Sequence, residues 1–151
     1  MYELEVALKI ALANTFIMYF KSHSYHWNVE GIMFSQYHEF FGDLYEELHS
    51  AVDVFAEEIR ATDAYAPTSL MDILKFATCT ENTSKPLGVR DMVTNLLTDN
   101  IEVTASLNKA FILAQSNNNQ GLMDFIAGRL DVHAKYGWML RSSVKGFGEQ
   151  Q

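Results

Sequence analysis

The scarcity of chain breakers is the feature that most limits how this sequence can fold. Its 151 residues contain 8 glycines and 2 prolines. Gly31 ends a first long stretch, Pro67 and Pro86 bracket a middle connection, and Gly121 opens a last long stretch. Between these positions apolar residues recur at steps of three and four, without the alternation of a strand, which predicts amphipathic helices. We expect four long helices, at residues 2–27, 35–62, 89–115 and 122–144.

The connection between the second and third helices is the one long connection that we expect. Within it, Thr68 is predicted to N-cap a short helix from Ser69 to Phe76. The sequence therefore predicts an all-α protein, a four-helix bundle with a short extra helix in its crossover. No repeat, low-complexity segment or linker interrupts it, so we expect a single domain over residues 1–151.

Net charge and cysteine content limit the classes of protein to which this chain can belong. The formal net charge of −8 disfavours a nucleic-acid-binding protein and favours attraction of cations. The single cysteine, Cys79, excludes an internal disulfide, suits a reducing compartment and is expected to be inert. Residues 1–5 lack the basic region of a signal peptide, and no uncharged apolar run reaches ~18 residues. We therefore expect a cytoplasmic protein without a membrane span.

Two histidines and two carboxylates form a candidate set of metal ligands: His26, His38, Asp53 and Glu57. A mixed nitrogen and oxygen set suits a divalent first-row metal such as iron, although zinc or manganese could use the same ligands. Asp53 and Glu57 are four residues apart and share a helix face. His38 precedes Asp53 by about 22 Å of helical rise, which is too far for both to bind one ion. Either the ligands form separate sites, or two chains each supply half of a site at a two-fold interface, which is our working hypothesis.

The second helix also carries a row of mostly acidic side chains opposite an apolar stripe. A charged helix face is often only a solvated surface, but this helix carries just one basic residue, Arg60, to balance it. A row of like charges destabilises a helix slightly, which a cation-attracting surface would explain. Asp43 and Glu46 are therefore further candidate metal ligands. The row consists of Glu39, Asp43, Glu46, Ser50, Asp53 and Glu57.

These motifs resemble the Dps family, the mini-ferritins first named as DNA-binding proteins from starved cells. The resemblance spans nearly the whole chain and lies in paired blocks at fixed spacing. The matching blocks are His23-x-x-His26-Trp27-Asn28-Val29-x-Gly31, then Phe34, His38 and Tyr45, then Asp53-x-x-Ala56-Glu57-x-Ile59-Arg60, and in the last helix Asp124, Arg129, His133, Lys135 and Trp138-Met139-Leu140-Arg141.

The resemblance implies a ferritin-like bundle whose subunits form a hollow dodecamer built from two-fold dimers. It implies a ferroxidase centre between two subunits, with His26 and His38 from one chain and Asp53 and Glu57 from its partner. The implied activity is oxidation of Fe(II) to Fe(III), usually by hydrogen peroxide, with ferric mineral stored inside. By the same resemblance, Asp124 is a candidate for an acidic three-fold pore, together with Asp131, while Gly128 replaces an acid often found there.

One position departs from the family pattern. Many members carry another acid four residues after the second histidine, where this chain has Gly42. The neighbouring acid, Asp43, is turned by ~100° on a helix and belongs more naturally with the acidic row. We therefore expect a weaker or altered second iron position. The alternative function is a shell with a degenerate centre that acts as a structural, metal-sequestering or DNA-coating protein.

Two other expectations concern haem and DNA. A haem-binding, bacterioferritin-like protein is disfavoured, because the only Glu-x-x-His motif is Glu46 to His49 and an intrasubunit di-iron site needs two. DNA-binding members usually carry a basic tail, but the first twenty residues here contain one basic residue, Lys9. After Trp138 only Arg141 and Lys145 are basic. Because duplex affinity depends on neutralising several phosphates, we expect no DNA binding.

Overall fold

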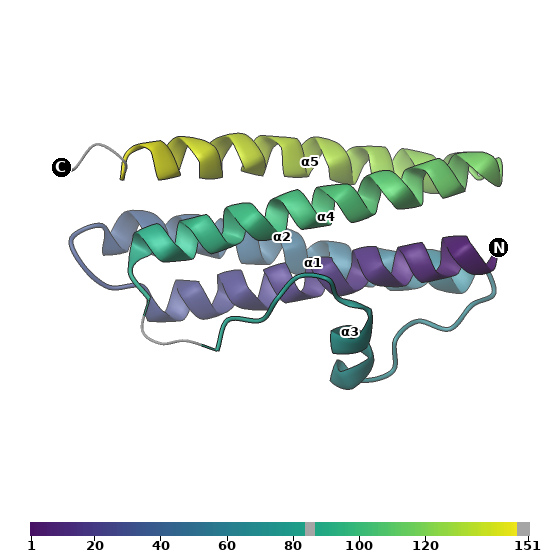
Figure 1. Cartoon of the computed structure of the whole chain (residues 1–151), viewed down its shortest axis with the longest axis horizontal. Coiled ribbons are helices and arrows are strands. Elements are labelled where there is room, and N and C mark those ends of the chain that lie inside the picture. The colour runs from purple at the N-terminus through teal and green to yellow at the C-terminus, as the bar shows by residue number, and fades with distance from the viewer. Residues whose placement is uncertain (84–86, 148–151) are drawn as a thin grey trace.

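Five helices form the protein in the computed structural model, which describes residues 1–83 and 87–147. The four long helices lie side by side, and the short α3 lies outside them in the crossover (Figure 1). The predicted four-helix bundle with an extra crossover helix is confirmed. None of the helices in these residues is long and apolar enough to cross a membrane. The helices are α1 (Tyr2–Asn28), α2 (Phe34–Ala61), α3 (Leu70–Phe76), α4 (Val89–Ser116) and α5 (Gln120–Lys145).

The apolar stripes of the helices meet in one core. Phe41 and Phe55 are among the largest fully buried side chains. The apolar stripe predicted on α2 is buried at every position except Val52, and it consists of Phe41, Leu44, Leu48, Val52, Phe55 and Ile59. α1 is buried over more of its circumference than α2, with Leu8, Ala11 and Met18 fully enclosed. Burial of a leucine, methionine or phenylalanine side chain is worth roughly 1.5–3 kcal/mol, which makes this core the main source of stability.

The cap of α3 differs from the prediction by one residue. Ser69, not Thr68, is the N-cap, and its hydroxyl accepts a hydrogen bond from the Asp72 N–H at 3.1 Å. Thr68 instead donates its hydroxyl and its backbone N–H to the Asp72 carboxylate, at 3.0 and 3.1 Å. These bonds lower the pKa of Asp72. The Ser69 hydroxyl and the Asp72 carboxylate thus each accept a backbone N–H at the start of α3, in the manner of a capping box.

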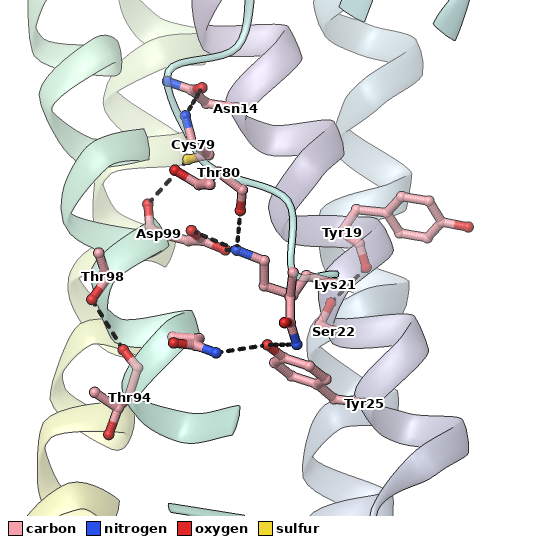
Figure 2. A network of polar contacts seen from close by, with 12 residues as sticks. Asn14, Tyr19, Lys21, Ser22, Tyr25, Cys79, Thr80, Thr94, Thr98 and Asp99 are labelled. Carbon is pink, nitrogen blue, oxygen red and sulfur yellow. Dashed lines mark hydrogen bonds and ion pairs between the residues drawn. The ribbon is translucent and has the colours of Figure 1, made fainter. Parts of the chain in front are cut away.

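Buried polar contacts attach the crossover to the bundle. The Asn14 side chain on α1 accepts hydrogen bonds from the N–H groups of Thr78 and Cys79, at 2.7 and 2.9 Å. Lys21 donates to the Thr80 carbonyl at 2.6 Å and pairs with Asp99 of α4 at 2.8 Å (Figure 2). Burial and the nearby Asp99 carboxylate raise the pKa of the Cys79 thiol, which supports the expectation that it is inert.

A second polar network joins α2, α4 and α5 inside the bundle. Arg129 forms a two-pronged ion pair with Glu47, one arm of which measures 3.0 Å. The same guanidinium approaches Nε2 of His133 at 3.3 Å, and Nδ1 of His133 lies 2.8 Å from the Asn100 side-chain oxygen. Since a guanidinium only donates, Nε2 accepts and Nδ1 carries the proton. His133 is completely buried and is held neutral, as burial and then Arg129 lower its pKa to about 3.

Candidate metal centre

The turn between α1 and α2 places His26 and His38 against each other. His26 lies in the last turn of α1, and His38 lies just over one turn into α2. Between them, the Val29 side chain is buried, and Gly31 adopts a φ of 109°, which a side chain would strain. The Phe34 N–H then bonds to the Gly31 carbonyl at 3.0 Å as α2 begins.

The two imidazoles form a reciprocal pair. Their rings stack with centroids 3.8 Å apart and planes at 14°. Nδ1 of His26 lies 2.6 Å from the His38 carbonyl oxygen, and Nδ1 of His38 lies 2.7 Å from the His26 carbonyl oxygen. A carbonyl oxygen only accepts, so both Nδ1 atoms donate and a neutral ring keeps its free lone pair on Nε2. This is the arrangement by which proteins orient histidines that bind metals.

Gly42 lies one turn after His38 and faces the His26 ring. A Cβ atom at this position would lie 3.1 Å from Nδ1 and 3.2 Å from Cε1 of His26. Both distances are shorter than ordinary van der Waals contact. The side chain that this chain lacks would therefore press on the hydrogen bond that orients the His26 ring. Sequence comparison with the family pattern found the departure at Gly42 but gave no reason for it.

The carboxylate half of the predicted set lies elsewhere on the same chain. Asp53 and Glu57 are exposed, one turn apart on α2, and Asp43 and Glu46 are also exposed on that helix. Within residues 1–83 and 87–147, no three His, Cys, Asp or Glu side chains come together closely enough to hold a metal ion. The structure therefore brings His26 and His38 together but does not bring any of these acids to them.

Two cavities in the part of the chain that the structure describes are also separate from these residues. Two pockets of about 390 and 450 Å³ lie between α1, the crossover and α4, near Lys21. Neither is lined by His26, His38, Asp53 or Glu57. The candidate ligands thus lie outside both of these cavities.

Aromatic side chains of α1 and α2 pack around the pair formed by His26 and His38. Phe34 stacks on His38 with centroids 4.9 Å apart, and His23 stacks on Tyr45 at 3.7 Å with planes at 8°. The pKa of His23 is lowered by burial and then by the neighbouring His26 and His49. Trp27, which adjoins His26 in sequence, leaves 57% of its surface exposed.

The sequence analysis did not identify one residue of this aromatic group, Tyr19. Tyr19 was not considered as a functional residue, yet its hydroxyl lies 3.2 Å from Nδ1 of His23. The available signal was the spacing of four residues between Tyr19 and His23, which places them one turn apart on α1.

The model of the ferritin-like domain family matches residues 5–147 of the chain. The chain belongs to the ferritin-like family. Its geometry agrees with this, since the bundle has long helices and one long crossover.

Solved structures narrow the membership to the Dps branch. Dps from Staphylococcus aureus superposes with a TM-score of 0.90 at 27% identity, over 95% of this chain and 96% of that one. The Dps protein from Vibrio cholerae O1, described as a member of a superfamily of ferritin-like diiron-carboxylate proteins, gives a TM-score of 0.89 at 26% identity, over 95% and 89%. The resemblance to the Dps family is therefore confirmed, and the protein is a Dps-family mini-ferritin.

A curated relative is similar to this mini-ferritin over most of its length. The uncharacterized low temperature-induced protein all0458 of Nostoc is 30% identical over 136 residues, which are 89% of this chain and 76% of that protein.

Proposed function

We propose that this Dps-family mini-ferritin oxidises Fe(II) to Fe(III) with hydrogen peroxide and stores the ferric product in a hollow homo-oligomeric shell, which we expect to be a dodecamer. The observation that carries this proposal is the pair of imidazoles, His26 and His38, whose Nδ1 atoms are both committed to carbonyl oxygens. That arrangement leaves the two Nε2 atoms as ready metal ligands.

The incomplete ligand set supports a centre shared between two chains. The imidazoles supply nitrogen ligands, and Asp53 and Glu57 supply oxygen ligands one turn apart on an exposed helix face. About 22 Å of helical rise separates His38 from Asp53, so one chain cannot complete the set. A two-fold axis joins the histidine half of each chain to the carboxylate half of the other, and it does so twice per dimer.

The chemistry of the ligands suits iron as the substrate. Hydrogen peroxide takes up two electrons and two protons to give two water molecules, and two ferrous ions supply the two electrons. The hard carboxylate oxygens of Asp53 and Glu57 stabilise the higher charge of the ferric product. The neutral imidazoles hold the ferrous ion without adding negative charge. Asp43 and Glu46 extend the acidic face of α2 along which cations approach.

Stopped-flow oxidation of Fe(II) by hydrogen peroxide under anaerobic conditions tests the activity. We expect the wild-type protein to oxidise iron well above the protein-free rate and Asp53→Ala to lose most of that gain. Asp91→Ala, which removes an exposed acid from α4, is the matched control and should retain it. A wild-type rate equal to that of the protein-free solution would leave the alternative, a shell with a degenerate centre that only sequesters metal or has a structural role.

Mixed oligomers test the sharing of the centre. Subunits carrying His26→Ala and His38→Ala are refolded together with subunits carrying Asp53→Ala and Glu57→Ala. In each mixed dimer one centre receives both intact halves, so activity returns although neither parent is active. If the mixture stays as inactive as its parents, the centre is not shared between subunits.

A further inference from the structure

Tyr19 and His23 form a hydrogen-bonded pair beside the candidate centre that the proposed iron oxidation does not use. The Tyr19 hydroxyl and Nδ1 of His23 are 3.2 Å apart, which is within reach for proton transfer. A neutral His23 protonated on Nε2 presents the Nδ1 lone pair to the phenol. Tyr19 is half-buried and projects from α1 away from the network of Lys21 and Asp99 (Figure 2).

A chain of close ring contacts connects this pair to His26. His23 stacks on Tyr45 at 3.7 Å with nearly parallel planes, and Tyr45 lies 5.2 Å from the His26 ring. The Tyr19 ring itself is 6.4 Å from Tyr45. Ring contacts therefore connect Tyr19 to His26 at every step.

Tyr19 is better suited to lose an electron than the other aromatic side chains beside the histidine pair. Oxidation of a phenol makes its O–H strongly acidic, so a base on the hydroxyl makes the oxidation easier. Among residues 1–83 and 87–147, Tyr19 has such a base, whereas the contacts of Tyr45 and Trp27 are ring contacts.

We propose that Tyr19 and His23 act as a proton-coupled redox pair that gives one electron to hydrogen peroxide when only one ferrous ion occupies the centre. The inference rests on the proposed function. Peroxide takes up two electrons and a single ferrous ion supplies one, so the second electron must come from the protein.

The step balances in atoms and electrons. The O–O bond of hydrogen peroxide breaks, and two water molecules form with two protons from solvent. One ferrous ion gives one electron and becomes ferric. Tyr19 gives the second electron; its O–H bond breaks, and the proton passes to Nδ1 of His23, where an N–H bond forms. A tyrosyl radical and an imidazolium remain, in place of a hydroxyl radical in solution.

The first test uses metal-free protein, so that it reads the pair independently of iron. A photo-excited ruthenium tris(bipyridine) complex with a sacrificial electron acceptor oxidises the protein, and transient absorption follows the tyrosyl radical. We expect a fast component that slows in deuterated water, disappears in Tyr19→Phe and persists in Tyr2→Phe, whose tyrosine is 76% exposed. In His23→Gln, Tyr19 remains but the isotope effect should be lost. An unchanged isotope-sensitive component in either Tyr19→Phe or His23→Gln overturns the proposal.

The second test uses less Fe(II) than there are centres, with anaerobic peroxide and freeze-quenched electron paramagnetic resonance. We expect a tyrosyl signal in the wild type and in Tyr2→Phe, and at least a several-fold weaker signal in Tyr19→Phe. Excess Fe(II) should suppress the wild-type signal, because a second ferrous ion then supplies the electron. Normal iron oxidation with an unchanged signal in Tyr19→Phe overturns this inference alone. A wild-type protein that does not oxidise iron overturns the proposed function as well.

Discussion

At the scale of single residues, Gly42 has two opposing effects on the protein. Glycine destabilises a helix by roughly 0.5–1 kcal/mol relative to alanine, so Gly42 weakens α2 locally. Its missing side chain also leaves the space that the His26 ring occupies, since a Cβ atom would lie 3.1 Å from Nδ1. The loss of helix stability acts on the fold, whereas the space left for the His26 ring acts on the candidate centre. A substitution at Gly42 can therefore be read separately in stability and in metal binding.

We expect Gly42→Ala to bind Fe(II) at least several-fold more weakly than the wild type while its melting temperature changes little. The new methyl group displaces the His26 ring, and the gain in helix propensity offsets that strain. Gly128→Ala is the matched control, because open space surrounds that position on α5. It should raise the melting temperature by about 1–4 °C and leave affinity unchanged. Anaerobic titration calorimetry and thermal unfolding measure both quantities, and equal affinity in Gly42→Ala and the wild type would contradict the role given to Gly42.

At the scale of elements, one amide side chain of α1 accepts two backbone hydrogen bonds from the crossover. Asn14 is fully buried and accepts two backbone hydrogen bonds, from Thr78 and Cys79. A buried backbone N–H left without an acceptor costs about 1–3 kcal/mol. A side chain more than sixty residues earlier in the chain therefore helps to hold the segment that follows α3 against the bundle.

We expect Asn14→Leu to lower the free energy of unfolding by about 2–4 kcal/mol, because it removes the acceptor for the buried Cys79 N–H and the partly buried Thr78 N–H. Asn108→Leu makes the same change at an exposed position of α4 and should stay within about 0.5 kcal/mol of the wild type. Urea unfolding measures the difference. Hydrogen exchange at the Thr78 and Cys79 amides should accelerate in the first variant only, and unaltered exchange there would show that another contact holds the crossover.

At the scale of the whole molecule, His133 makes the stability of the bundle depend on pH. It lies between Arg129 on its own helix and Asn100 on α4, and Glu47 of α2 pairs with that arginine. Its pKa is lowered from 6.5 to about 3 in the folded protein. Between these values the unfolded chain binds a proton that the folded chain does not bind, so acidification favours unfolding over this window.

We expect stability to fall between about pH 6.5 and pH 4 by an extra increment, approaching about 1.4 kcal/mol per pH unit, that depends on His133. His133→Gln keeps a neutral polar side chain and should remove this increment, whatever its stability at neutral pH. Urea unfolding at a series of pH values gives the slopes. Parallel slopes for the two proteins would contradict a neutral, buried His133 in the folded state.

The sequence by itself determined the helices and the division of the candidate ligands, because both follow from helical period and rise, which are local properties. The step of fifteen residues from His38 to Asp53 already excluded one ion bound by both of these side chains of one chain. Local pattern also placed α3, but it selected Thr68 as the cap, since the choice between adjacent hydroxyls depends on which one faces the Asp72 amide. Only the tertiary structure decided how α1 meets α2. The reciprocal bonds of His26 and His38 and the tight approach at Gly42 depend on the register of two packed helices, and no periodicity in either helix specifies that register.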